Sequence, residues 1–218
     1  MSISIAWALA ALCVALGGAL AFVGRRLAAQ EAFYLEVLQV LARAVDATDT
    51  AQGGTSHRAR MLARALAKEM RLSSSVSRHV ECAAMLHRLG RIGIDPHLLN
   101  KPGKLTAKEY EDIQKYTAIG HDILAQSKFL GPVARMILYQ QEWYNGRGYP
   151  EGLKGEAIPL GSRIVGLINA WEAMRSDRPY RKALSVEQAL EELRKGAGTQ
   201  FDPVVVEAFL KIAQTMPR

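Results

Sequence analysis

The sequence predicts an all-α fold, a helical bundle joined to one membrane-spanning helix. Apolar residues recur at helical spacing from Glu31 almost to the end of the chain. No alternating strand pattern competes with this periodicity. Helix-start patterns recur between the apolar segments, each pairing a capping side chain with a residue that favours the first turn: Thr106 with Glu109, Ser185 with Gln188, and Asp202 with Pro203.

The expected elements follow one another with short breaks. A first helix begins near residue 31, and a stretch rich in Thr, Gly and Asp at 46–56 interrupts it. A long Gly- and Pro-rich loop is expected over 145–159. The remaining helices are expected at about 55–72, 75–89, 132–141 and 161–175, and after the starts at 106, 185 and 203.

The amino-terminal segment has the character of a membrane anchor. Residues 3–24 carry no charge, and as a helix they would span roughly 33 Å, enough to cross a bilayer core. Arg25 and Arg26 follow directly, and no Lys or Arg precedes the run. The positive-inside rule then places the carboxyl-terminal side in the cytoplasm. We therefore expect a single-pass anchor at 1–26 in the inner membrane and a helical cytoplasmic domain at 27–218.

Two other interpretations of this segment are weaker. A cleaved signal peptide would have a basic residue before a shorter apolar core. A helix in a soluble core would not be apolar on every side.

Composition narrows the class of protein. The 218 residues suffice for one buried domain with a short appendage. The two cysteines, Cys13 and Cys82, lie in apolar and helical patterns, so no disulfide framework is expected. The net charge of +7 suits an anionic ligand, an acidic lipid surface or nucleic acid. Because the chain has no block of basic residues and no nucleic-acid motif, we favour a basic surface near acidic lipids and expect no nucleic-acid partner.

The segment from Gln140 to Pro150 reads QQEWYNGRGYP. Its end, Gly148-Tyr149-Pro150, resembles the signature of the HD-GYP family, and the likeness extends over about 34–210. This resemblance implies an HD-GYP-like helical bundle. It also implies the hydrolysis of cyclic di-GMP at a centre of two or three metal ions.

Several metal-ligand positions of that family are altered in this chain. By the resemblance, His57 and His87 keep two of them, as vestigial ligands. Arg91 stands where the family has a lysine. The other ligand positions hold weaker donors or a cation: Arg88, Tyr116, Gln140, Gln141 and Asn169.

These residue types argue against a bound metal. An amide oxygen is a poor substitute for imidazole on a transition metal, and two histidines do not complete a site. Relative to the family, the pocket is about three charge units more positive, and a divalent ion about 5 Å from Arg88 would be repelled by several kcal/mol. Glu142, at a helix end, and Glu172, expected to face away from Asn169, are weak candidates for a replacement base. The sequence therefore predicts no metal, no cofactor and no catalytic residue.

Anion binding is the function that such a pocket would keep. Arginine binds phosphate bidentately, and Arg88 would stand in for a metal cation. The alternative is retention for folding, with 148–150 as a turn and Arg178 as a brace for its loop. The candidate phosphate-binding residues are Arg88, Arg91, Arg147, Gly148, Tyr149, Arg178 and Arg181.

Two functions remain open. The favoured one is a membrane-anchored, catalytically degenerate HD-GYP domain in cyclic di-GMP-related signalling. It would bind cyclic di-GMP or another phosphate ligand, or contact proteins such as a diguanylate cyclase. The alternative is an active, metal-dependent cyclic di-GMP phosphodiesterase with an altered centre. Family members often dimerise, but this sequence leaves a homodimer undecided.

Overall fold

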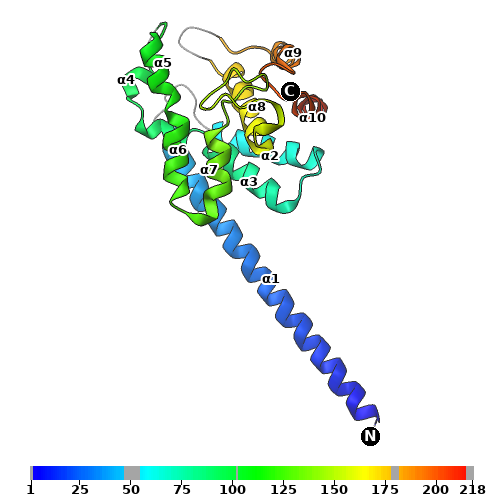
Figure 1. The fold of residues 1–218 in the computed structure, drawn as a ribbon. Helices are drawn as coiled ribbons and strands as arrows, with labels where there is room; N and C mark the ends of the chain where they lie inside the picture. The colour runs from blue at the N-terminus through cyan, green and yellow to red at the C-terminus, as the bar shows by residue number, and fades with distance from the viewer. Residues whose placement is uncertain (1, 47–54, 102, 178–181, 215–218) are drawn as a thin grey trace. The chain divides into compact units, whose positions relative to one another are not determined.

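A computed structural model describes residues 2–46, 55–101, 103–177 and 182–214 (Figure 1). Over these residues the secondary structure is helical, with no named strand, so the all-α prediction is confirmed. The chain divides into two compact units, Met1–Leu38 and Gln39–Arg218.

The first unit consists of most of helix α1, which runs without interruption over Ser2–Asp46. The sequence predicted a separate helix from about residue 31, whereas the structure has one continuous helix. The membrane-spanning helix expected over 3–24 is not found: within the described ranges, no helix is both long enough and apolar enough to cross a bilayer.

The second unit contains the remaining helices. Helix α2 packs against α3 and α8, α3 also packs against α7, and α6 packs against α7 and the 3₁₀ turn η1 (Figure 1). Their bounds are α2 Thr55–Glu69, α3 Ser74–Leu86, η1 Leu89–Gly93, α4 Pro96–Leu99, α5 Ala107–Gln114, α6 Tyr116–Ala125, η2 Lys128–Leu130, α7 Gly131–Leu138, η3 Gly155–Ala157, α8 Leu160–Met174, α9 Val186–Gly196 and α10 Pro203–Ala213.

The predicted helix starts are confirmed. Thr106 and Ser185 each form a capping box, in which the cap side chain accepts from the third residue of the helix and that residue's side chain accepts from the cap. Asp202 caps α10 through Val204 N at 2.8 Å. Three helices end about three residues earlier than predicted: α2 at Glu69, α3 at Leu86 and α7 at Leu138. After α7 the chain turns over residues 139–142.

The core of the second unit is aliphatic. The apolar faces of α2, α3, α7, α8 and α10 meet in it, as their helical periodicity predicts. The largest apolar side chains with almost no exposed surface are Leu66, Met85, Leu86, Ile137, Ile158, Ile164, Leu167, Ile168, Leu193 and Phe209. Two polar side chains, His87 and Gln140, are equally buried, and both belong to the candidate site.

Candidate functional site

His87 follows the last turn of α3 and is buried. Its Nδ1 lies 2.7 Å from the carbonyl oxygen of Ala84, so Nδ1 carries the proton and donates it. Its Nε2 lies 3.2 Å from Nε of Arg88, which has only a donor to offer. Burial, followed by the charge of Arg88, lowers the pKa of His87 to about 3. At neutral pH the imidazole is therefore uncharged, and both of its ring nitrogens are engaged.

The positions where the family resemblance implies lost ligands do come together around this ring. Gln140 Nε2 donates to the carbonyl oxygen of His87 at 2.8 Å. Gln141 Nε2 donates to the hydroxyl of Tyr116 at 2.7 Å. Asn169 lies close enough to His87 and Tyr116 to influence the pKa of both side chains. Gln140 and Gln141 therefore bond to protein groups at positions where the resemblance implies metal ligands.

The structure places the other retained histidine differently. His57, on α2, is exposed, and its Nδ1 lies 3.4 Å from Gln39 Nε2. Over the described residues, no group of three or more His, Cys, Asp or Glu side chains is arranged to hold a metal ion.

The residues at this centre do not fit the metal ions of the family. A metal binds the unprotonated nitrogen of a neutral imidazole, and in His87 that nitrogen already accepts a hydrogen bond from Arg88. The neighbouring donors are amides and a phenol, which are weak ligands for transition metals. The guanidinium adds a fixed positive charge at the same place.

An open cavity of about 510 Å³ adjoins this cluster. That volume lies within the range of small-molecule sites. Tyr116, Gln140, Gln141 and Asn169 contribute to its wall. Aromatic and charged side chains complete much of the lining: Arg91, Trp143, Tyr144, Tyr149, Arg163, Glu192, Phe201 and Asp202.

Of the predicted phosphate-binding residues, Arg91 and Tyr149 line this cavity. The guanidinium of Arg91 lies over the Tyr116 ring, 5.8 Å from its centre. Arg147 is exposed and is not part of the cavity wall. Arg178 and Arg181 fall outside the described residues.

Arg88 and Gly148 occupy more confined places. Arg88 is 3% exposed and lies away from the cavity wall, against His87 and the start of α2. A Cβ atom at Gly148 would overlap the backbone of Gln141 and Trp143. A role in folding therefore accounts for Gly148 through this close approach.

The two carboxylates considered as replacement bases both have partners in the protein, although Glu142 also lines the cavity and its buried Oε2 has no hydrogen-bond partner. Glu142 Oε1 accepts from the backbone N–H groups of Glu151, at 2.7 Å, and Gly152, at 3.0 Å, and so holds the loop after α7. Glu172 forms an ion pair with Arg58 at 3.0 Å. Burial raises the pKa of Glu172, although the nearby Arg58 and Arg88 act in the opposite direction.

Some cavity residues were not singled out from the sequence. Arg163 pairs with Asp202, which joins α8 to the start of α10. Arg163, Gly166 and Ala170 line the cavity at positions i, i+3 and i+7 of α8. Extending the helical face of Asn169 along its own helix would have suggested Gly166, at i−3, and through it Arg163.

The comparisons with known proteins agree on one family. A family model described as HD domain matches residues 39–205. The chain is 40% identical over 181 residues to the cyclic di-GMP phosphodiesterase response regulator RpfG of Xanthomonas campestris pv. campestris, covering 81% of this chain and 47% of that protein. It is 37% identical over 184 residues to a cyclic di-GMP phosphodiesterase of Thermotoga maritima, covering 84% and 50%.

A third relative and one solved structure come from Vibrio cholerae. The 3'3'-cGAMP-specific phosphodiesterase 3 is 30% identical over 185 residues, covering 84% of this chain and 40% of that protein. The crystal structure of the cyclic GMP-AMP phosphodiesterase V-cGAP3 superposes with a TM-score of 0.66 at 24% identity, covering 82% of this chain and 48% of that one. The chain spans about half the length, or less, of the curated relatives named here.

Proposed function

Because this chain belongs to the HD domain family, as a member of its HD-GYP group, we propose that its helical domain acts in cyclic di-GMP-related signalling by binding the nucleotide without hydrolysing it. The observation that carries this proposal is the cavity of about 510 Å³ beside the altered centre. The named relatives act on cyclic dinucleotides, and we infer the class of ligand for this chain from them.

The cavity offers the groups that such a ligand needs. Arg91 presents a guanidinium, which pairs with phosphate oxygens in a charge-assisted, bidentate manner. Tyr144 and Tyr149 add aromatic rings to the same wall. Rings of this kind stack on nucleobases with little dependence on sequence.

The donor groups around His87 disfavour hydrolysis. A metal centre would have to generate the attacking hydroxide at neutral pH, and the residues around His87 do not fit such a centre. Glu172 is paired with Arg58, and Glu142 holds a loop through Oε1, which leaves the buried Oε2 of Glu142 without a hydrogen-bond partner. A bound nucleotide would therefore remain intact.

Titration calorimetry of the full chain with cyclic di-GMP tests binding. We expect a saturable heat, and Arg91→Ala should weaken the affinity about 10- to 100-fold through loss of charge-assisted phosphate contacts. Arg147→Ala removes an exposed arginine outside the cavity wall and is the matched control, with affinity near that of the wild type. Absence of heat, or equal losses in both variants, would count against the proposal.

A second candidate is a metal-dependent phosphodiesterase with an altered centre. The activities of the named relatives favour it over the non-catalytic function. It requires stoichiometric iron, manganese or zinc in the purified chain, and loss of both metal and hydrolysis in His87→Ala. Metal-dependent cleavage of cyclic di-GMP by the wild-type chain would establish this candidate in place of the first.

Protein partners and cellular location extend the same proposal. Contact with a diguanylate cyclase or with a second copy of the chain would transmit the bound state, and co-purification with and without nucleotide tests this. The uncharged run at 3–24, followed by Arg25 and Arg26, supports a place at the inner membrane with the carboxyl-terminal unit in the cytoplasm. Membrane fractionation tests this location, and protease accessibility of that unit tests its side of the membrane. Recovery of the protein in the soluble wash, and not with the membranes, would contradict the location.

A further inference from the structure

We propose that Arg88 is a built-in cation that takes the structural place of a metal ion in this domain. The guanidinium of Arg88 donates from Nε to Nε2 of His87 at 3.2 Å. Because Nδ1 of the same ring faces the carbonyl oxygen of Ala84, Nε2 is the nitrogen that a metal would bind. The positive charge of the side chain therefore lies against the atom that would otherwise face an ion.

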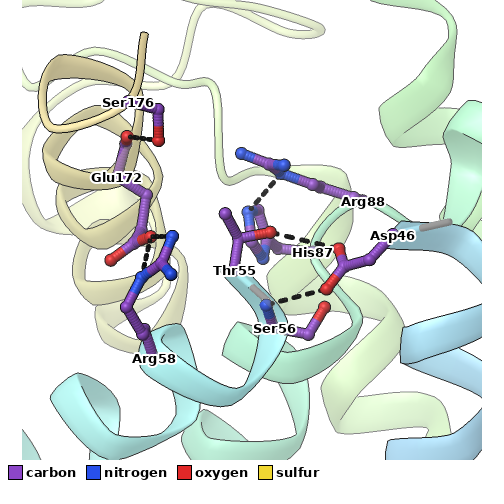
Figure 2. Close-up of polar contacts among 8 residues, drawn as sticks. All are labelled: Asp46, Thr55, Ser56, Arg58, His87, Arg88, Glu172 and Ser176. Atoms are coloured by element: carbon purple, nitrogen blue, oxygen red, sulfur yellow. Dashed lines mark hydrogen bonds and ion pairs between the residues drawn. The ribbon is translucent and has the colours of Figure 1, made fainter. Parts of the chain in front are cut away.

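The charges around Arg88 fit a resident cation. Figure 2 shows Arg88 beside the His87 ring, with Asp46 on one side and Glu172 with Arg58 on the other. Asp46 and Glu172 are both buried, and the charges of Arg88 and Asp46 both act on the Glu172 carboxyl. With His87 uncharged, two arginines balance two carboxylates in this cluster.

The carboxylates of Asp46 and Glu172 also form contacts that hold helices together. Asp46 accepts from the Thr55 hydroxyl and from the Ser56 N–H, both at 3.1 Å, and so caps the start of α2 (Figure 2). Glu172 connects α8 to α2 through Arg58, whose own side chain is 54% exposed. Arg88 is the buried cation of this cluster, and removing it would leave two buried carboxylates with one largely solvated partner.

The remaining positions of the centre are bonded within the protein, except that the buried Oε1 of Gln140 has no hydrogen-bond partner. Gln140 donates to the His87 carbonyl, and Gln141 donates to the Tyr116 hydroxyl. Asn169 lies beside His87 and Tyr116 and influences the pKa of both. The replaced residues therefore form a polar network with Arg88 at its charged end, and the fold does not depend on a divalent ion.

The first test measures the response of the full wild-type chain to metal, without nucleotide. Metal analysis should find well under one transition ion per chain. The melting temperature should change by less than about 1 °C when EDTA or excess Mn²⁺ or Zn²⁺ is added, because an ion that does not bind the folded state cannot stabilise it. A saturable rise in melting temperature with Mn²⁺ or Zn²⁺ would overturn the proposal.

The second test removes the cation. Arg88→Met keeps much of the side-chain length without the charge, and it should lower the melting temperature by roughly 10 °C, since it leaves buried carboxylates uncompensated. Arg88→Lys keeps the charge and should lose clearly less. Arg147→Met, at an exposed arginine, is the matched control and should melt as the wild type does.

Three outcomes of the second test would overturn the proposal. An Arg88→Met variant that melts within about 2 °C of the wild type would show that the charge is not needed. Equal losses in Arg88→Met and Arg88→Lys would show that shape, and not charge, matters. If Arg88→Met fails to fold, the proposal requires that Arg88→Lys still folds, and failure of both variants would overturn it. Both tests are independent of the proposed function, because neither contains a nucleotide.

Discussion

The His87 ring is held neutral by its surroundings, and this has a consequence for stability. In the folded chain its pKa is lowered to about 3 from an ordinary value of 6.5. Between these two values the unfolded state binds the extra proton and the folded state does not. The free energy of unfolding therefore rises with pH across this window, and the contribution is lost as pH falls from 6.5 towards 3.

The variant His87→Gln isolates this contribution. Glutamine can accept a hydrogen bond from Arg88 but cannot take up a proton in this range. Between about pH 7.5 and about pH 4.5, the wild type should lose up to roughly 3 kcal/mol more stability than the variant. Urea denaturation of both chains at the two pH values measures the difference. Parallel pH dependence in the two chains would contradict the assignment.

At the scale of single residues, residue identity predicted the chemical types present at this centre but not how the side chains interact. Arg88 was expected to stand in for a metal cation and to hold a phosphate. The structure instead places it in a buried cluster with His87. Charge and donor type can be judged from residue identity alone. The direction in which a side chain points depends on neighbours such as Glu172, which are distant in the sequence.

Close contact between η1 and α6 depends on glycine at position 90. A Cβ atom there would overlap the Tyr116 carbonyl group and lie 2.6 Å from Gly120 N. Gly90→Ala should therefore destabilise the domain by about 1–3 kcal/mol through overpacking against backbone. Gly131→Ala is the matched control, since a Cβ atom at Gly131 meets nothing within 4 Å, and it should be neutral or slightly stabilising. Denaturation midpoints that rank the two variants the other way would refute this packing.

Asp202 has two roles at the start of α10, and two substitutions separate them. Its Oδ1 accepts from Val204 N, and its Oδ2 pairs with Arg163. Asp202→Asn keeps a capping oxygen but loses the ion pair, whereas Asp202→Ala loses both. We expect the alanine variant to be about 1 kcal/mol less stable than the asparagine variant, the usual value of a cap. Equal stabilities in urea would mean that the cap contributes nothing.

Helix starts were more predictable than helix ends. The capping patterns at Thr106, Ser185 and Asp202 are local, because side chain and backbone partner lie within three residues. The end of α7 at Leu138 was placed three residues too late. The turn that follows is held by Glu142 through the backbone of Glu151, a contact across nine residues that periodicity does not reveal.

At the scale of the whole molecule, the site combines segments that lie far apart in the sequence. Arg58 and Glu172 are 114 residues apart, and Gln140 reaches His87 across 53. The resemblance to the HD-GYP family predicted that such segments meet, and the cluster around His87 agrees with it. The extent of the cavity towards Asp202 could not be predicted, since it depends on how α8 and α10 pack.

The cavity and the altered centre together predict metal-independent binding. Cyclic di-GMP should raise the melting temperature of the full chain in proportion to its occupancy, because it binds the folded state. EDTA should leave that rise unchanged, since Arg91 and the aromatic wall supply the contacts. If chelation abolished the rise, the nucleotide would be held through an ion.

The fate of the nucleotide tests the central claim most directly. The full chain is equilibrated with cyclic di-GMP in the presence of Mn²⁺ or Fe²⁺, the bound fraction is separated, and its nucleotide is identified by chromatography. We predict that bound cyclic di-GMP is recovered intact. Recovery of linear nucleotide, formed in proportion to enzyme and metal, would contradict the account and identify the chain as a hydrolase.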